Sequence, residues 1–153
     1  MVKIGFKKIH PDAKLPGYAH EGDAGMDVSS IEDVDLAPYT PTLVRTGIIA
    51  EAPKGHEIQV RPRSGLALKH GVTVWNSPGC VDENYRGEIG VILFWAPSLR
   101  YSMSEKTPRF KIAKGDRIAQ IVVSPVAHCC VSEVDEVSET NRGSGGFGST
   151  GLS

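Results

Sequence analysis

Residues 56–74 have the sequence HEIQVRPRSGLALKHGVTV, which combines two strand patterns with one short helical pattern. Ile58 and Val60 alternate with polar neighbours, and residues 72–74 repeat the alternation. A period of two is typical of half-buried β-strands. Between the two patterns, Gly65–His70 is long enough for little more than one helical turn. This stretch therefore predicts two strands joined by a single short helix.

The rest of the chain continues the strand pattern without any long helical window. The further expected strands are Val2–Phe6, Leu43–Ile49, Ile89–Trp95, Ile118–Val123 and Val126–Val137. Gly 17 and Pro 10 together make about 18% of the 153 residues, against roughly 12% in an average protein. Short strands separated by turn residues predict an all-β fold, that is, a sandwich, jelly roll or barrel. Arg100–Pro108 is polar and carries no period, so we expect an exposed loop there.

Length, charge and cysteine content narrow the class of protein. A chain of 153 residues is long enough for one domain with a sizeable core. The formal net charge of −1 excludes a strongly basic nucleic-acid binder and a polybasic membrane binder. No apolar run reaches membrane-spanning length, and the start lacks a secretory h-region. Three cysteines give neither a disulfide framework nor a four-ligand zinc site, so we expect reduced thiols and an intracellular, cytoplasmic location, nuclear or organellar in a eukaryote.

Three familiar motifs are excluded by their details. Residues 143–148, GSGGFG, match the glycine string of dinucleotide folds but lack the following helix and acidic residue, and Ser149 stands where a phosphate loop needs Lys. The turn at 82–87 starts like a calcium loop, but Arg86 replaces an oxygen ligand. The five histidines show no zinc-ligand spacing.

Three features keep both a structural and a chemical interpretation. Asp82 follows the apolar Val81, where a half-buried carboxylate can act as a base, or it simply caps a hairpin turn. Ser64 is a natural N-cap for the short helix, whose positive end can also receive an anion. The glycine-rich tail from Asn141 is either a disordered end or an arm whose N–H groups wrap phosphate while Phe147 stacks on a base.

Taken in order, five segments resemble the motifs of the homotrimeric dUTP pyrophosphatases (dUTPases), over about residues 3–151. The segments are Asp23–Val28 (DAGMDV), Arg61–Ala67 (RPRSGLA), Asn76–Glu88 (NSPGCVDENYRGE), Gly115–Gln120 (GDRIAQ) and Arg142–Gly151 (RGSGGFGSTG). The third and fifth are long enough to make a chance match negligible. The resemblance implies an all-β, jelly-roll-like barrel or sandwich with one short helix and a flexible C-terminal arm, residues 1–140 forming the β domain and 141–153 the arm.

The resemblance also implies the reaction, which is hydrolysis of dUTP to dUMP and pyrophosphate. This reaction keeps uracil out of DNA and supplies dUMP for thymidylate synthesis. Water attacks the α-phosphorus with Mg²⁺ on the triphosphate, and Asp82 resembles the general base. Asp27 resembles the acid that holds a water of the Mg²⁺ shell. The residues that the family places around the substrate are Arg63, Ser64, Gly65, Asn76, Gly79, Cys80, Val81, Tyr85, Gly90, Gln120, Arg142, Phe147 and Gly148.

Within that set, the Asn76–Tyr85 hairpin is similar to the family's uracil slot. Its main chain and Asn76 read the base edge, Gln120 supports the base through water, and Tyr85 lies under the deoxyribose and excludes a 2′-hydroxyl. Two residues depart from the family pattern. Trp75 is bulkier than expected beside Asn76, and Cys80 stands where Thr is common, although a main-chain role for Cys80 preserves the slot.

The family resemblance further implies a homotrimer in which three subunits share each site. The arm of one subunit then closes a site formed by two others, with no nucleic acid or membrane as partner. A dCTP deaminase shares the fold, but we would expect it to have a different hairpin and no complete fifth motif. A non-catalytic nucleotide sensor is the alternative from another class, and the presence of Asp82, Tyr85, Arg142 and Phe147 argues against a loss of catalysis.

Overall fold

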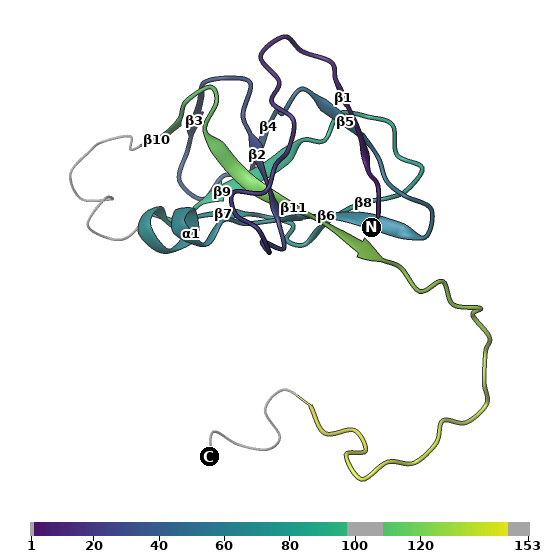
Figure 1. The fold of residues 1–153 in the computed structure, drawn as a ribbon. Helices are drawn as coiled ribbons and strands as arrows, with labels where there is room; N and C mark the ends of the chain where they lie inside the picture. The colour runs from purple at the N-terminus through teal and green to yellow at the C-terminus, as the bar shows by residue number, and fades with distance from the viewer. Residues whose placement is uncertain (1, 98–108, 147–153) are drawn as a thin grey trace.

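The computed structural model describes residues 2–97 and 109–146, which form short strands and one short helix (Figure 1). The elements are β1 (Gly5–Lys8), β2 (Met26–Ser29), β3 (Val34–Leu36), β4 (Thr42–Val44), β5 (Ile48–Glu51), β6 (His56–Arg61), α1 (Ser64–His70), β7 (Val72–Val74), β8 (Gly79–Val81), β9 (Val91–Trp95), β10 (Phe110–Ile112) and β11 (Arg117–Pro125). This architecture confirms the predicted fold class. No helix in the described ranges is long and apolar enough to cross a membrane.

The strands pair in four antiparallel sheets rather than in one closed barrel. The largest sheet has the order β2-β11-β6-β8, and a second has the order β4-β9-β7. Two-stranded sheets, β1-β5 and β10-β3, complete the sandwich. In the largest sheet, Gln120 of β11 lies opposite both Asp27 of β2 and Arg61 of β6. On the other side of β6, Val60 lies opposite Gly79 of β8.

The core follows from the alternation of apolar residues along these strands. In β9, Val91, Leu93 and Trp95 are buried, whereas Ile92 and Phe94 are only partly covered. Burial of a side chain of this size is worth about 1.5–3 kcal/mol. The indole N–H of Trp95 donates to the carbonyl of His70 at 3.0 Å, so the core is tied to the C-terminal end of α1.

The expected strand over Leu43–Ile49 is interrupted because Gly47 turns the chain. Gly47 has a φ of +67°, and a Cβ there would lie 2.8 Å from the Cβ of His10. Only glycine fits both the conformation and the space, so β4 ends before this residue and β5 begins after it. The strands that the sequence pattern missed, β2, β3, β8 and β10, have three or four residues each, too few to show a period. β1 also begins at Gly5 rather than at Val2.

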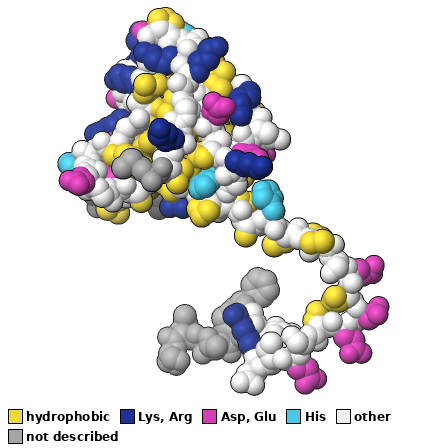
Figure 2. All heavy atoms as spheres, turned by 45° about the vertical axis from the view of Figure 1, so that its right-hand side comes forward, with side chains coloured by type: hydrophobic (Ala, Val, Ile, Leu, Met, Phe, Trp, Pro, Cys, Tyr) yellow, Lys and Arg dark blue, Asp and Glu magenta, His cyan; other side chains and the backbone are white. Residues whose placement is uncertain are grey.

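The strand predicted over Val126–Val137 is wrong. Residues 126–146 form an extended coil that leaves the body of the molecule (Figure 1). A strand needs a neighbour for its N–H and C=O groups. The Val126 N–H donates to the Gly55 carbonyl at 2.9 Å, but among the described residues no strand pairs with the rest of this segment. Val131 is 92% exposed and Val137 is 84% exposed, and the acidic side chains of the coil stand clear of the body (Figure 2). The Arg100–Pro108 loop lies outside the described residues.

Candidate active site

A cavity of about 420 Å³ opens between residues 76–90 and strands β4, β6 and β9. β7 pairs with β9 and β8 pairs with β6, so the expected Asn76–Tyr85 hairpin is instead a loop that crosses between two sheets. Leu43, Val60, Ile89 and Ile92 contribute apolar walls. Seven of the expected site residues line it, namely Asn76, Gly79, Cys80, Val81, Asp82, Tyr85 and Gly90. A concave, mostly apolar space with a few polar groups is the usual form of a small-molecule site. The hairpin residues that the sequence marked are therefore brought together.

Gly79 allows the Asn76 amide to approach the large sheet. A Cβ on Gly79 would lie 3.1 Å from Asn76 Nδ2 and 3.3 Å from the Cβ of Val60. A larger residue would push either the amide or the hairpin away from the strand. The Asn76 amide offers both donors and an acceptor, so this wall of the cavity can recognise the polar edge of a flat ring.

The Tyr85 ring is held by its own hairpin at the rim of the cavity. Its main-chain N–H donates to the carbonyl of Asp82 at 3.1 Å, and its hydroxyl donates to the carbonyl of Glu88 at 3.1 Å. A Cβ on Gly87 would lie 2.2 Å from the Tyr85 hydroxyl oxygen. The ring thus folds across a residue that must lack a side chain, and it presents an apolar surface to the cavity.

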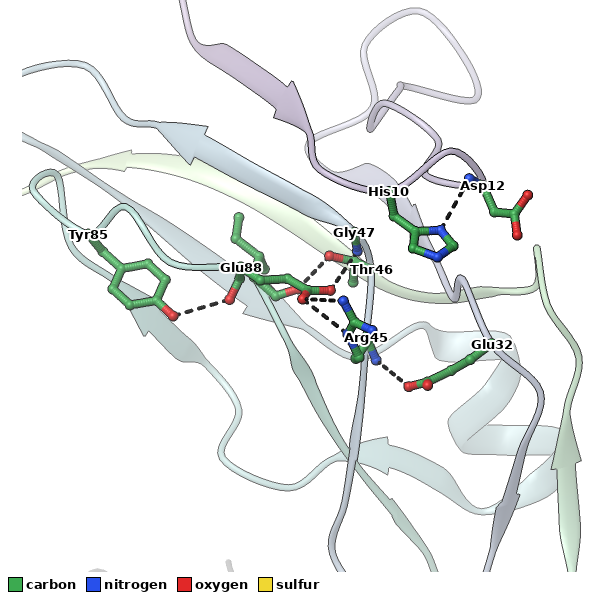
Figure 3. A network of polar contacts seen from close by, with 9 residues as sticks. His10, Asp12, Glu32, Arg45, Thr46, Gly47, Tyr85 and Glu88 are labelled. Atoms are coloured by element: carbon green, nitrogen blue, oxygen red, sulfur yellow. Dashed lines mark hydrogen bonds and ion pairs between the residues drawn. The ribbon is translucent and has the colours of Figure 1, made fainter.

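Glu88, next in the hairpin, is anchored to the turn between β4 and β5 (Figure 3). Its Oε2 accepts bonds from Arg45 Nε and Nη2 at 3.1 Å, and its Oε1 accepts the Gly47 N–H at 2.7 Å. Burial raises the pKa of Glu88, but the Gly47 amide, the Arg45 guanidinium and the Thr46 amide outweigh it and lower the pKa below 4.5. The carboxylate is therefore ionised. Glu88 belongs to the third motif but was not singled out as a site residue, and no sequence signal marked Arg45.

Asp82 lies on the border between this cavity and a second hollow of about 330 Å³. It is exposed rather than half-buried, because it follows the edge strand β8 directly. Beside it, Cys80 Sγ donates to Glu57 Oε2 at 2.9 Å and lies 3.7 Å from Asp82 Oδ1. The hydrogen bond to Glu57, followed by burial and the charges of Glu57 and Asp82, raises the pKa of the Cys80 thiol to about 11.

Asp27 forms a separate charged cluster with residues of the second and fourth motifs. Its Oδ1 lies 3.2 Å from Arg63 Nε, and its Oδ2 accepts from Arg117 Nη1 at 2.8 Å. Gln120 Nε2 donates to Asp27 Oδ1 at 3.3 Å. The Asp27 side chain is only 11% exposed, so its carboxylate is largely buried among these partners. Arg117 is a member of this cluster that the sequence analysis did not select.

The start of α1 differs from the expected cap. Arg63, not Ser64, is the N-cap residue, and no side chain caps the helix. The Arg63 carbonyl accepts the Ala67 N–H at 3.0 Å, which places the first helical residue at Ser64. The Arg63 side chain bonds to Asp27 and to the Arg117 carbonyl instead. Ser64 and Gly65 are exposed beside this cluster, with the Ser64 hydroxyl not used for capping.

The cavity and the Asp27 cluster lie on opposite faces of the largest sheet. Residues directly opposite on neighbouring strands point to the same face. Gln120, opposite Asp27, alternates with the buried Ala119 and Ile121, so this pair points away from the core. Val60 is buried and lies opposite Gly79, so the cavity is on the core side. The described chain therefore separates the cavity wall from the Asp27 cluster. Cys80 lies opposite Gln59 and so points to the outer face, and Asp82 lies beside it at the edge of the cavity.

The described part of the expected arm, residues 141–146, contributes little to either group. Arg142 is exposed, and its Nε donates to the Gly145 carbonyl at 2.8 Å within the same coil. Phe147 and Gly148 lie outside the described residues.

Comparison with known proteins identifies the chain. The dUTPase family model matches residues 11–151, which is most of the sequence. The chain belongs to the dUTPase family. Deoxyuridine 5'-triphosphate nucleotidohydrolase of Picosynechococcus sp. is 54% identical over 94% of this chain and 95% of its own length. The protein of the same name from Clostridioides difficile is 48% identical over 99% of this chain and 100% of its own length.

Solved structures agree with this assignment. The dUTPase of Staphylococcus bacteriophage 80alpha with dUpNHpp has a TM-score of 0.85 and 26% identity, covering 98% of this chain and 99% of its own. A mutant dUTPase from phage phi11, studied for its structural Mg(II) ion, has a TM-score of 0.77 at 22% identity, over 88% of this chain and 97% of its own. The expected activity is thus confirmed. The chain is a dUTP diphosphatase that hydrolyses dUTP to dUMP and pyrophosphate.

Proposed function

We propose that this hydrolysis takes place in a composite site of a homotrimer, in which the cavity of one subunit faces the Asp27 cluster of another. The observation that supports it is the separation of the two groups of residues on opposite faces of one sheet. A single chain cannot turn both faces to one substrate, whereas two neighbouring copies can. The exposed valines of residues 126–146 also favour assembly, since burial of exposed apolar side chains is favourable.

In this proposal the hairpin recognises the nucleoside. The main chain of Gly79, Cys80 and Val81, together with Asn76, reads the uracil edge, and Gly90 leaves room for the base. Cytosine would put an amino group where the site expects an acceptor, and the unpaired polar groups that result discriminate strongly. Tyr85 lies against the deoxyribose and excludes a ribose 2′-hydroxyl.

Asp82 is the general base of the proposed mechanism. It accepts a proton from the water that attacks the α-phosphorus, and pyrophosphate leaves on the opposite side. Its exposure at the border of the cavity gives water direct access to the carboxylate. A positioned base contributes about 10²–10⁴-fold to the rate. The remaining rate enhancement comes from charges placed around the phosphates.

Arg63, Ser64 and Gly65 are assigned to the phosphates on the neighbouring subunit, and Gln120 supports the base side of the site through water. Arg63 supplies positive charge, while the Ser64 hydroxyl is free of capping and can donate. Arg142, Phe147 and Gly148 belong to an arm, residues 141–153, supplied by a third subunit. Arg142 would pair with the terminal phosphate and Phe147 would stack on uracil.

The residues present fit a Mg²⁺ ion carried mainly by the triphosphate. Mg²⁺ usually keeps several waters and binds through one or two carboxylates plus phosphates. Asp27 is the one carboxylate in its cluster, and no group of three His, Cys, Asp or Glu among the described residues could hold a metal alone. Asp27 would hold a water of the metal shell, and the metal would neutralise charge on the phosphate oxygens.

We place the enzyme in the cytoplasm. Its three cysteines are free, as is typical of reducing intracellular compartments, and the named relatives are bacterial.

Complementation tests the shared site. An Asp82→Asn variant is co-expressed with a variant truncated before Arg142, and trimers containing both chains are isolated with two affinity tags. Because the two defects then fall on different subunits of some sites, we expect part of the dUTP hydrolysis to return. Verified mixed trimers with no more activity than the two parents would contradict the shared site.

A further inference from the structure

Glu88 occupies a position in the hairpin that links the sugar-facing ring to the rest of the fold. Its main-chain carbonyl accepts the Tyr85 hydroxyl at 3.1 Å. Its carboxylate, on the same residue, accepts three hydrogen bonds from the β4–β5 turn, two from Arg45 and one from the Gly47 N–H. The Glu88 side chain is 21% exposed and the Arg45 side chain 49% exposed.

The partners of the carboxylate are themselves fixed. The Arg45 N–H donates to Glu32 Oε1 at 2.9 Å, which holds the end of β4 (Figure 3). Gly47 cannot move toward the core, because His10 and Ala13 fill the space next to its Cα. The turn thus presents the Gly47 N–H to Oε1 and two Arg45 N–H groups to Oε2 in one arrangement, and hydrogen bonds to an ionised acceptor are stronger than those between neutral groups.

The bonds of Ile89 are the main-chain part of the same anchorage. The Ile89 N–H donates to the Ile48 carbonyl at 2.9 Å, and the Thr46 hydroxyl donates to the Ile89 carbonyl. These bonds fix the chain after Glu88. The Glu88 carbonyl shares its peptide plane with the Ile89 N–H, so the bond to Ile48 holds this carbonyl from one side. On the other side stands Gly87, which has no side chain to anchor the chain, so the second anchor is the Glu88 carboxylate.

We propose that Glu88 is a positioning residue for sugar selection: its carboxylate, clamped by Arg45 and Gly47, holds the carbonyl that fixes the Tyr85 ring. A fixed ring leaves no room for a 2′-hydroxyl, whereas a ring free to tilt admits ribose. Weakening the clamp therefore raises kcat/KM for UTP more than it changes kcat for dUTP, because Asp82 does not contact Glu88. The inference rests on the role proposed above for Tyr85.

The test is the ratio of kcat/KM for dUTP to kcat/KM for UTP. Glu88→Gln keeps the size of the side chain and an acceptor for the Gly47 N–H but loses the charge that pairs with Arg45. Tyr85→Phe removes the hydroxyl that Glu88 accepts. We expect each variant to lower the ratio about threefold to tenfold, which is the effect of one ordinary hydrogen bond. Since both act on one contact, the double variant should lower it no further than the stronger single variant.

Two further variants complete the design. Asp12→Asn breaks an ion pair of similar length, 3.0 Å to Lys114, away from the cavity and should leave the ratio unchanged. Arg45→Lys keeps the charge but replaces the two N–H groups that meet Oε2 by a single ammonium group, so it should lower the ratio in the same direction even where Glu88→Gln is poorly folded.

The outcomes separate the inference from the proposal on which it rests. A ratio that collapses in Tyr85→Ala but stays at the wild-type value in Glu88→Gln and Arg45→Lys overturns the role of Glu88 alone. A ratio that does not change in Tyr85→Ala overturns the role of Tyr85, and the role of Glu88 with it. Additive losses in the Tyr85→Phe/Glu88→Gln double variant also contradict the inference, because they would mean that the two residues act separately.

Discussion

The cavity and the Asp27 cluster differ in almost every physical property. The cavity is concave, lies on the core side of the large sheet, and is walled by apolar residues such as Leu43 and Val60. The cluster lies on the outer face and consists of ionic contacts, with Asp27 between Arg63 and Arg117. The first suits an uncharged ring and sugar, and the second suits charged phosphates. In the proposed site, each face would recognise one half of a nucleoside triphosphate.

This difference explains how one small chain can bind a substrate that has an uncharged base and sugar at one end and charged phosphates at the other. Guanidinium groups beside the uracil slot would have to be desolvated, and burial of charge is costly unless it is paired. Placing the charges on an outer face leaves them hydrated until a phosphate arrives. Asp82, at the rim of the cavity, is where the two halves have to meet.

The largest effect is expected at that rim. Asp82→Asn keeps the shape of the side chain but cannot accept a proton, so kcat should fall by about 10²–10⁴-fold. Affinity for dUpNHpp, measured by calorimetry, should change little because the slot and the phosphate contacts remain. Asp35→Asn, which removes a carboxylate on the exposed side of β3, is the control and should retain wild-type turnover. Near-normal kcat in Asp82→Asn would rule out its role as base.

A smaller effect is expected in the Asp27 cluster. Asp27→Asn removes the charge shared by Arg63 and Arg117, and both guanidiniums lose their anchor. Loss of such a supporting contact commonly costs about 10–100-fold in metal affinity or activity, and we expect the lower end of that range. The measurement is dUTP hydrolysis during a Mg²⁺ titration, in which the half-saturating Mg²⁺ concentration should rise. The same Mg²⁺ dependence in Asp27→Asn and wild type would contradict the role of Asp27 in the metal shell.

A third prediction concerns the clamp behind the cavity and its pH dependence. The pKa of Glu88 is lowered in the fold from its usual 4.5. A lowered carboxyl pKa stabilises the fold fully above that value, and the stabilisation is lost as pH falls through the folded pKa. Urea unfolding should therefore show wild type more stable than Glu88→Gln by about 1–2 kcal/mol at pH 7. The difference should shrink below pH 4.5, at fixed protein concentration. A difference in the free energy of unfolding that does not change with pH would contradict the lowered pKa of Glu88.

The sequence predicted the fold where strands were long enough to show their period. Ile58 and Val60 alternate with polar residues over the six residues of β6, and the pattern identified them as core. β10 has three residues, and no period can be recognised in so short a run. The segment 126–137 has the composition of a strand, but a strand also needs a partner, and composition does not say whether its own chain supplies one.

The site was predicted as a set of residues but not as an arrangement. The motifs marked Asp27 and Gly79 alike, and nothing in their order indicated that the Asp27 carboxylate and the cavity wall at Gly79 lie on opposite faces of a sheet. That fact depends on the register, in which Gln120 meets Asp27 while Gly79 meets Val60. Arg45 was missed for a related reason, because its contact with Glu88 joins residues 43 positions apart.

The smallest expected effect concerns one proton beside Asp82. The Cys80 pKa of about 11 follows mainly from its hydrogen bond to Glu57. The thiolate is the nucleophile, so at pH 8 Cys80 should react with iodoacetamide about 100-fold more slowly than a thiol with the ordinary pKa of 9.0.

In a Cys129→Ser/Cys130→Ser background, Glu57→Gln removes the main cause of the raised Cys80 pKa and should speed the labelling of Cys80 severalfold. Asp135→Asn in the exposed coil removes an equal charge elsewhere and should not. Mass spectrometry of the labelled peptide gives both rates. Equal rates with and without the Glu57 carboxylate would show that Cys80 and Glu57 do not share a proton, and that the rim of the cavity is electrostatically independent of β6.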